Sequence, residues 1–166
     1  VFASRHGQIV RSVGLLEDLA RGVPLSPMDF SVSVHNATAG LFSIARGDRS
    51  PATALAGGRE SFSAAVLEAQ AMLLEGAEKV LLVYHDETPP RALDGTWDGE
   101  AADWSLALLL GRDQGRILEM RLEDAPARDE SDSAPQAYAL ARLLARGEGR
   151  ERWLNGRHLW TWEFPS

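Results

Sequence analysis

The stretch SPMDFSVSVHNATAGLFSIARGD at residues 26–48, followed by ALAGG at residues 54–58, decides the fold predicted from this sequence. Apolar and polar residues alternate over residues 30–34, which predicts a strand. Small residues then turn the chain into a helix that runs to about Ala45. A short strand over residues 51–56 ends in a glycine pair and leads into a second helix. The pattern of strand, tight turn and helix therefore occurs twice in succession.

The chain on either side of this stretch shows the same two periodicities. Apolar residues at helical spacing predict helices over residues 8–21, 60–74 and 136–146. Residues 80–84 form a continuous β-branched run, which is typical of a buried parallel strand. A helix between each pair of strands in this half predicts an α/β fold with a mostly parallel sheet.

The C-terminal part predicts an antiparallel portion. Residues 104–110 and 117–122 are expected to be strands joined by a hairpin connection at residues 111–115. The acidic run at residues 125–135 predicts a loop, and residues 158–164 alternate like a strand. The late aromatic residues fit either an exposed interaction surface or a strand that closes over the core; these residues are Trp153, Trp160, Trp162 and Phe164.

Composition bounds the function. The chain has 166 residues, a net charge of −7 and no cysteine, which suits one layered α/β domain over residues 1–166. The negative charge argues against nucleic acid as a partner, and the lack of cysteine excludes disulfides, thiolate nucleophiles and cysteine-ligated zinc. The four histidines are scattered without ligand spacing, so no metal site is expected. No apolar run reaches the ~20 residues that span a bilayer, and we expect a cytoplasmic protein. The sequence starts at Val1 within a predicted strand, so we expect residues upstream.

The order of these motifs resembles the N-terminal half of the β-ketoacyl synthases of the thiolase-like superfamily, over about residues 1–85. The runs SVHNATAG at residues 33–40 and WTWEF at residues 160–164 are similar to a short subfamily associated with aryl polyene and related fatty-acid-like pathways. The chain also resembles chain-length factors, the cysteine-less partners of some ketosynthases. The resemblance implies a thiolase-like half-fold.

The resemblance places the position of the family's nucleophile on Ala37. Neither Ala37 nor its neighbours Asn36 and Thr38 can form a thioester, because acyl transfer in the family needs a thiolate. The family's C-terminal half, which supplies catalytic histidines, has no counterpart in the sequence. His35, Asn36, Ala37 and Thr38 are therefore expected to face a substrate pocket without catalysing condensation, and no cofactor is expected.

The resemblance also implies a role beside a catalytic subunit. We expect a non-catalytic partner that helps a full-length ketosynthase in fatty-acid, aryl polyene or polyketide-type biosynthesis, as a heterodimer or, failing that, a homodimer. An acyl carrier protein is a further candidate partner. The strand proposed as the dimer edge, because a strand edge needs a partner, consists of Phe30, Ser31, Val32, Ser33 and Val34.

Other readings of single residues stay open. Asn36 could instead cap the following helix while His35 packs locally. His85 with Asp86, or Ser33, could serve an autonomous thioester hydrolase, and a stand-alone acyl- or carrier-binding domain could bind its ligand beside His35. The glycine pair at residues 57–58 lacks the spacing of a phosphate-binding loop and predicts a tight strand-to-helix turn.

Overall fold

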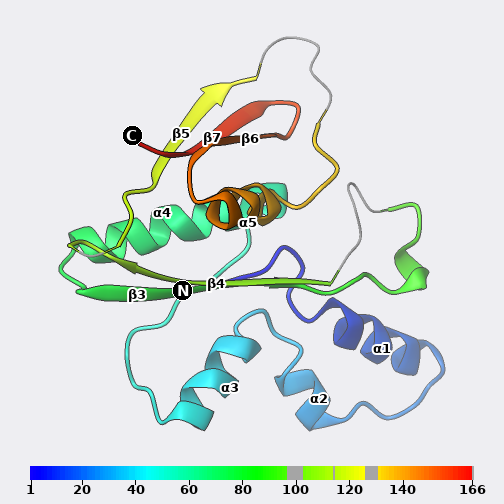
Figure 1. Ribbon diagram of the computed structural model, residues 1–166. Helices are drawn as coiled ribbons and strands as arrows, with labels where there is room; N and C mark the ends of the chain where they lie inside the picture. Colours follow the sequence, from blue (N-terminus) through cyan, green and yellow to red (C-terminus); the bar gives the residue numbers. More distant parts are fainter. Residues whose placement is uncertain (97–102, 114, 126–130, 166) are drawn as a thin grey trace. The chain divides into compact units, whose positions relative to one another are not determined.

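The computed structural model describes residues 1–96, 103–113, 115–125 and 131–165. The fold is mixed α/β with a mostly parallel sheet flanked by helices, as the sequence predicts (Figure 1). The described residues fall into two compact units, one up to Leu110 and one from Gly111 onward. Within these residues, no helix is long and apolar enough to cross a bilayer.

The first unit is built on a four-stranded sheet with the strand order β2-β1-β3-β4. Its strands are β1 (Phe2–Ala3), β2 (Ala54–Leu55), β3 (Lys79–Asp86) and β4 (Trp104–Gly111). β1 runs parallel to both of its neighbours, with Phe2 aligned to Ala54 on one side and to Val83 on the other. The strands predicted at residues 51–56 and 80–84 are confirmed as β2 and β3.

Helices cover both faces of this sheet. The helices α1 (Ile9–Ala20), α2 (Pro27–Ser31) and α3 (Ala37–Arg46) lie on one face, and α4 (Ser61–Leu74) lies on the other (Figure 1). Two short 3₁₀ helices, Gly58–Glu60 and Arg91–Leu93, occupy connections. The ring of Phe2 packs 5.4 Å from Phe42 of α3, whereas the ring of Tyr84 packs 5.6 Å from Phe62 of α4. Alternate residues of the strands therefore face different helices.

The strand predicted at Phe30–Val34 is wrong, because these residues end a helix and enter a turn. The hydroxyl oxygen of Ser26 accepts a hydrogen bond from the Asp29 amide at 3.2 Å, and Pro27 occupies the first helical position. Both are favourable at a helix start, since the proline has no amide to leave unpaired there. α2 ends at Ser31 with Val32 as its C-cap. Helix capping thus overrides the alternating pattern.

The predicted hairpin between residues 104–110 and 117–122 is also wrong. β4 lies beside β3 in the first sheet, whereas β5 (Glu119–Asp124) pairs with β7 (His158–Phe164) in a second sheet. The ladder between β5 and β7 is antiparallel and runs from Glu119 opposite Glu163 to Asp124 opposite His158. The antiparallel partner of β5 is therefore β7 rather than the predicted strand at residues 104–110.

The second unit holds an antiparallel sheet of strand order β5-β7-β6, with β6 at Gly149–Leu154. The helix α5 (Gln136–Arg146) packs against β6 and β7, and the predictions for residues 136–146 and 158–164 are confirmed. Trp162 is fully buried, and Trp153 and Trp160 are at most 4% exposed. These tryptophans therefore belong to the core rather than to an exposed surface. Part of the loop predicted at 125–135 lies outside the described residues.

Candidate functional site

The carboxyl ends of three parallel strands meet at one edge of the first sheet. β1, β2 and β3 point the same way, and ligands of open α/β sheets bind at such edges. Polar residues gather here from the ends of β1 and β3 and from the start of α3. We call Ser4, His35, Thr38, Tyr84 and Asp86 the carboxyl-end cluster.

The carboxylate of Asp86 is the centre of this cluster. It accepts hydrogen bonds at 2.8 Å from the Ser4 hydroxyl and from the Arg5 amide, and one from the Tyr84 hydroxyl. The Ser4 hydroxyl oxygen in turn accepts a bond of 2.7 Å from the Gly7 amide. Asp86 thus ties the end of β3 to the turn that follows β1.

Tyr84 acts in this network as a neutral donor. Its side chain is 4% exposed. Burial, together with the nearby Asp86 carboxylate, raises the pKa of Tyr84 well above its usual range, because an ionised phenol would lose its hydration and face a like charge. The phenol therefore stays protonated and keeps its bond to Asp86.

His35 joins the turn after β1 to the end of β2. Its Nε2 lies 2.8 Å from the carbonyl oxygen of Leu55. Gly7 has a φ of +58°, and a Cβ there would lie 2.6 Å from Nδ1 of His35. Glycine is thus required at position 7 both by the backbone conformation and by the close approach of the imidazole.

The residues predicted to face a pocket have different surroundings. Thr38 accepts a hydrogen bond of 3.0 Å from the side chain of Gln8, and Ala37 is 9% exposed. Asn36 is exposed and occupies the N-cap position of α3, as predicted, but its side chain makes no capping hydrogen bond. Their role towards a substrate stays a prediction.

Sequence reasoning missed Ser4 and Tyr84, and it paired Asp86 with His85 rather than with these two residues. Tyr84 and Asp86 are two residues apart in a strand and so share one face, which the sequence did signal. Ser4 gave a weaker signal, because its partner follows 82 positions later along the chain.

The starts of α3 and α4 differ in what precedes them along the chain. α3 begins at Ala37 after the turn that ends α2. α4 begins at Ser61 after β2 and the tight turn at Gly57 and Gly58, as predicted for the glycine pair. The Ser61 hydroxyl oxygen accepts a hydrogen bond from the Gly57 amide at 2.9 Å, and the same hydroxyl donates one to the Gly58 carbonyl oxygen at 2.7 Å. Residues 54–61 thus form a strand, a tight turn and the start of a helix.

The sequence model described as β-ketoacyl synthase, N-terminal domain, matches residues 1–163. The chain belongs to this family. Among curated proteins, no sequence matches it. The chain is similar to a chain of a solved structure, the complex of the ketosynthase ApeO with its chain length factor ApeC from Xenorhabdus doucetiae. The similarity has a TM-score of 0.88 at 27% identity and covers 98% of this chain and 67% of the matched chain, so the thiolase-like fold predicted from the sequence is confirmed.

The hydrolase hypothesis gains no geometric support in this β-ketoacyl synthase domain. A triad requires a direct hydrogen bond between histidine and carboxylate. Asp86 shares a strand face with Tyr84, to which it is bonded, so the side chain of His85 points to the opposite face. The Ser33 hydroxyl donates to the Phe30 carbonyl at 2.8 Å, within the turn after α2.

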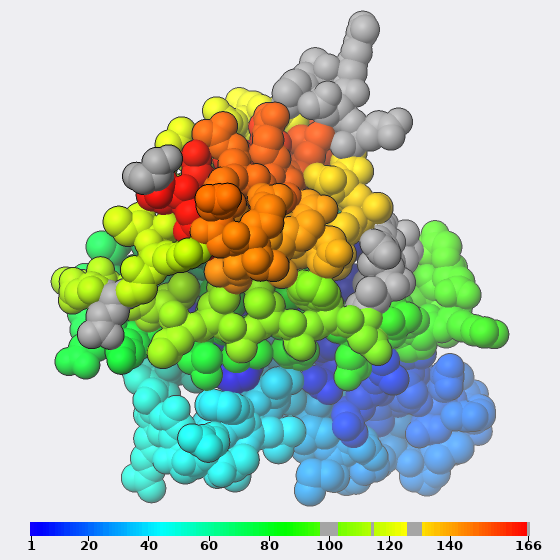
Figure 2. Space-filling model, in the orientation of Figure 1, coloured from blue at the N-terminus to red at the C-terminus, as the bar shows by residue number. Residues whose placement is uncertain are grey.

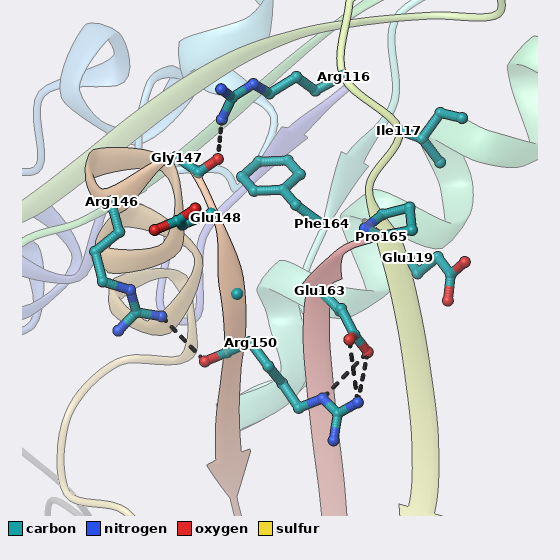
Figure 3. A pocket seen from close by; sticks show the side chains of 11 residues that line it. Arg116, Ile117, Glu119, Arg146, Gly147, Glu148, Arg150, Glu163, Phe164 and Pro165 are labelled. Carbon is teal, nitrogen blue, oxygen red and sulfur yellow. Dashed lines mark hydrogen bonds and ion pairs between the residues drawn. The ribbon is translucent and has the colours of Figure 1, made fainter.

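An open groove lies in the second unit of the β-ketoacyl synthase domain (Figure 3). This open groove of about 1310 Å³ is lined by three arginines and three glutamates, so its charge is balanced; these are Arg116, Arg146, Arg150, Glu119, Glu148 and Glu163. Arg150 makes a forked ion pair with Glu163 at 2.9–3.1 Å. Arg116 donates to the Gly147 carbonyl and lies 5.2 Å over the ring of Phe164. These contacts stabilise the end of α5 and the sheet.

Metal ligands do not gather in the described part of the chain, where no group of three or more histidine, aspartate and glutamate side chains could hold an ion. The carboxyl-end cluster fits that finding, because its single carboxylate is already occupied by three hydrogen-bond donors.

Proposed function

We propose that this chain is a non-catalytic β-ketoacyl synthase-like subunit that pairs with a complete ketosynthase. The observation that carries the proposal is the family match over residues 1–163 in a sequence without cysteine. No side chain in the chain can therefore form the thioester of the condensing reaction.

Two helix starts compete for the position equivalent to the family's nucleophile. The family resemblance implies Ala37, which starts α3. The start of α4 has the better geometry, because the turn at Gly58 and Arg59 follows a strand of the central sheet. We favour this turn, where Arg59 would fill the place of a nucleophile with a long cation.

The structure supports a different partner edge from residues 30–34. β2 ends the row β2-β1-β3-β4 in the described sheet. The carbonyls of Thr53 and Leu55 accept bonds from β1 at 2.8 and 3.2 Å, so the backbone groups of Ala54 and Ala56 point the other way. An outward row of amides and carbonyls on a strand with small side chains suits pairing with a second chain.

Apolar side chains beside the sheet offer further contact area. The segment from α1 to α3 forms one continuous outer layer of the first unit (blue to cyan in Figure 2). It exposes many large apolar side chains, and six of them are Leu16, Leu19, Met28, Phe30, Val34 and Ile44. Large apolar side chains that stay exposed in one segment are candidates for contact with a partner. Phe30 and Val34, first placed on a dimer edge strand, therefore stay in the proposal as contact residues.

The proposed roles of the two subunits follow from the lack of cysteine in this chain. The partner supplies the cysteine and the histidines of the condensing site, and this chain helps to shape the space for the acyl group. The solved complex of ApeO with ApeC supports such a pairing for the matched proteins. An acyl carrier protein as carrier of the substrate, and fatty-acid, aryl polyene or polyketide chemistry as the pathway, belong to the same proposal.

The test is co-expression with the complete ketosynthase of the same gene cluster, with a tag on the ketosynthase alone. We expect the wild-type chain to co-purify in a one-to-one ratio. Ala54→Pro should lower the recovered amount at least tenfold, because proline removes an outward amide and its ring projects from the edge.

Ala54→Ser is the matched control, since it keeps the amide and should co-purify like the wild type. Circular dichroism and thermal unfolding of both variants alone check that the fold is retained. Equal recovery of Ala54→Pro and Ala54→Ser would remove β2 as the edge. A wild-type chain that stays alone with every such ketosynthase would remove the subunit proposal itself.

A further inference from the structure

The second sheet has two outer edges in the described chain, and its strand order places β5 and β6 on them (Figure 1). In an antiparallel pair, residues that bond the neighbouring strand alternate with residues whose amide and carbonyl point outward. The Asn155 amide donates to the His158 carbonyl oxygen at 3.1 Å, so Asn155 bonds towards the side of β7. The outward residues of β6 are therefore Arg150, Arg152 and Leu154.

The outer edge of β6 is already occupied at both ends. The Leu154 amide donates to the Asp132 carboxylate at 2.7 Å, and the Leu154 carbonyl oxygen accepts from the Asp132 amide at 2.8 Å. At the other end, the Arg150 carbonyl oxygen accepts from the Arg146 guanidinium at 3.0 Å. An unpaired row of amides and carbonyls attracts another strand, and covering the row prevents this. β6 is therefore protected from pairing with a second chain.

The outer edge of β5 is not covered in this way. The Ala125 amide donates to the Arg157 carbonyl oxygen at 2.9 Å, so the outward residues of β5 are Met120, Leu122 and Asp124. Within the part of the chain that the structure describes, no hydrogen bond joins their outward backbone groups to another segment. The side chain of Leu122 is large and apolar and yet 52% exposed. β5 thus presents open backbone groups beside an exposed leucine.

The charges on β5 indicate what covers this edge. Glu119, Arg121 and Glu123 alternate with the outward residues and share one face of the sheet. Arg121 is 61% exposed and pairs with Glu119 at 2.9 Å, whereas Glu123 has no ion pair among the described residues. A second, antiparallel copy of β5 centred on Leu122 would place Arg121 of each strand directly opposite Glu123 of the other. Opposite charges in this position stabilise a ladder.

The neighbouring registers are less favourable. Centring the pair one residue earlier places Arg121 opposite its own copy, and centring it one residue later does the same for Glu123. Like charges directly opposite each other destabilise a ladder. A centre at Met120 would extend the ladder to residues before Glu119, where β5 begins. The charge pattern therefore selects the register centred on Leu122.

We propose that the open edge of β5 joins two copies of this chain as antiparallel strands about a two-fold axis at Leu122. The two Leu122 side chains cover each other, and an Arg121–Glu123 pair lies on either side of them. Such a contact is self-complementary, as a two-fold axis requires. The inference is independent of the proposed ketosynthase partner, because that pairing uses β2 of the other sheet.

The first test reverses the charges and measures the dimer dissociation constant of the isolated chain by sedimentation equilibrium. Arg121→Glu and Glu123→Arg should each raise this constant at least tenfold, because each places like charges opposite each other at two places in the dimer. The double variant Arg121→Glu/Glu123→Arg exchanges the charges and should restore the wild-type constant. Circular dichroism of all three variants checks that the fold is retained.

The second test uses the lack of cysteine in the sequence. Mild oxidation should cross-link Leu122→Cys into a dimer, because Cα atoms of a hydrogen-bonded antiparallel pair lie about 5.5 Å apart, within the range of a disulfide. Met120→Cys is the matched control, since the register places it opposite Asp124 rather than its own copy. It should stay monomeric on a non-reducing gel.

Three results would overturn the proposal. One is a wild-type chain that stays monomeric at millimolar concentration. Another is a dimer that both single charge reversals leave unchanged, or that Leu122→Cys and Met120→Cys cross-link equally well. The third comes from Ala54→Pro, which should not alter this dimer; loss of the dimer in that variant would place the contact on β2 instead.

Discussion

The starts of α3 and α4 are the two candidates for the nucleophile-equivalent position, and they differ in what precedes and surrounds them. α3 follows a turn after a five-residue helix and starts at Ala37, whereas α4 follows a sheet strand and a glycine turn. The first turn of α4 is completely buried at Ser61, Phe62 and Ser63. The difference teaches that the start of α4 belongs to the buried framework behind a strand, whereas the start of α3 follows a short helix.

The surfaces around the two helices differ in the same way. α4 buries seven of its fourteen residues, whereas α3 buries only Ala37 and Ala39 and exposes Leu41 and Ile44. α4 thus belongs to the framework of the first unit, and α3 belongs to its apolar outer layer. We expect stability to depend on the former and association to depend on the latter.

The largest expected effect compares the aromatic residues of the two helices. Phe62→Ala should lower the free energy of unfolding by about 3–5 kcal/mol, because it leaves a cavity beside Tyr84 in a fully buried place. Phe42→Ala should cost about 1–2 kcal/mol, since Phe42 is only partly buried. Urea unfolding of both variants measures the difference, and equal costs would contradict the distinction between framework and outer layer.

An intermediate loss of stability is expected at Gly7, in the turn that His35 contacts. Gly7→Ala should lower the free energy of unfolding by about 2–3 kcal/mol, because the left-handed backbone costs about 1 kcal/mol and the imidazole must move away from the Leu55 carbonyl. Gly22→Ala is the matched control, because Gly22 has a φ of +71° with nothing within 4 Å of a Cβ. It should cost about 1 kcal/mol. If thermal unfolding gives equal losses, His35 does not hold this turn.

The smallest expected effect locates the nucleophile-equivalent position. The sequence has no cysteine, so Arg59→Cys and Ala37→Cys each carry one reporter thiol. Both positions lie at or just before a helix start, which lowers a thiol pKa; Arg59→Cys should react with iodoacetamide about tenfold faster at neutral pH, because Ala37 is buried. Ser50→Cys, at an exposed position, sets the rate of an ordinary thiol. A faster reaction and a lower thiol pKa at position 37 would favour the start of α3.

The layered α/β fold could be predicted because long-period patterns survive in the sequence. The helices at 60–74 and 136–146 and the strand at 158–164 follow clear periodicities, and they lie where the sequence predicts them. The strand prediction for residues 30–34 is wrong because Ser26 and Pro27 start a helix just before them, and this outweighs an alternation of five residues. The hairpin prediction is wrong because the partner of a strand depends on distant residues, here those of β7.

The candidate site was predictable only in part. His35 and Thr38 were singled out, and both have contacts that reach distant segments, to the Leu55 carbonyl and to Gln8. The sequence suggests that Asp86 pairs with His85, because the two residues are neighbours in the chain. In a strand, however, neighbouring side chains point to opposite faces. The edge proposed for the partner could not be predicted from the sequence, since the order that places β2 at the end of the described sheet is a property of the folded chain.

Amide hydrogen exchange on β2, with and without the complete ketosynthase, tests the central claim most directly. The proposed pairing predicts that the Ala54 and Ala56 amides exchange fast in the free chain and at least tenfold more slowly in the complex, because they point away from β1. The Leu55 amide, which points towards β1, should change little. A complex that forms while Ala54 and Ala56 exchange as fast as in the free chain would contradict the account.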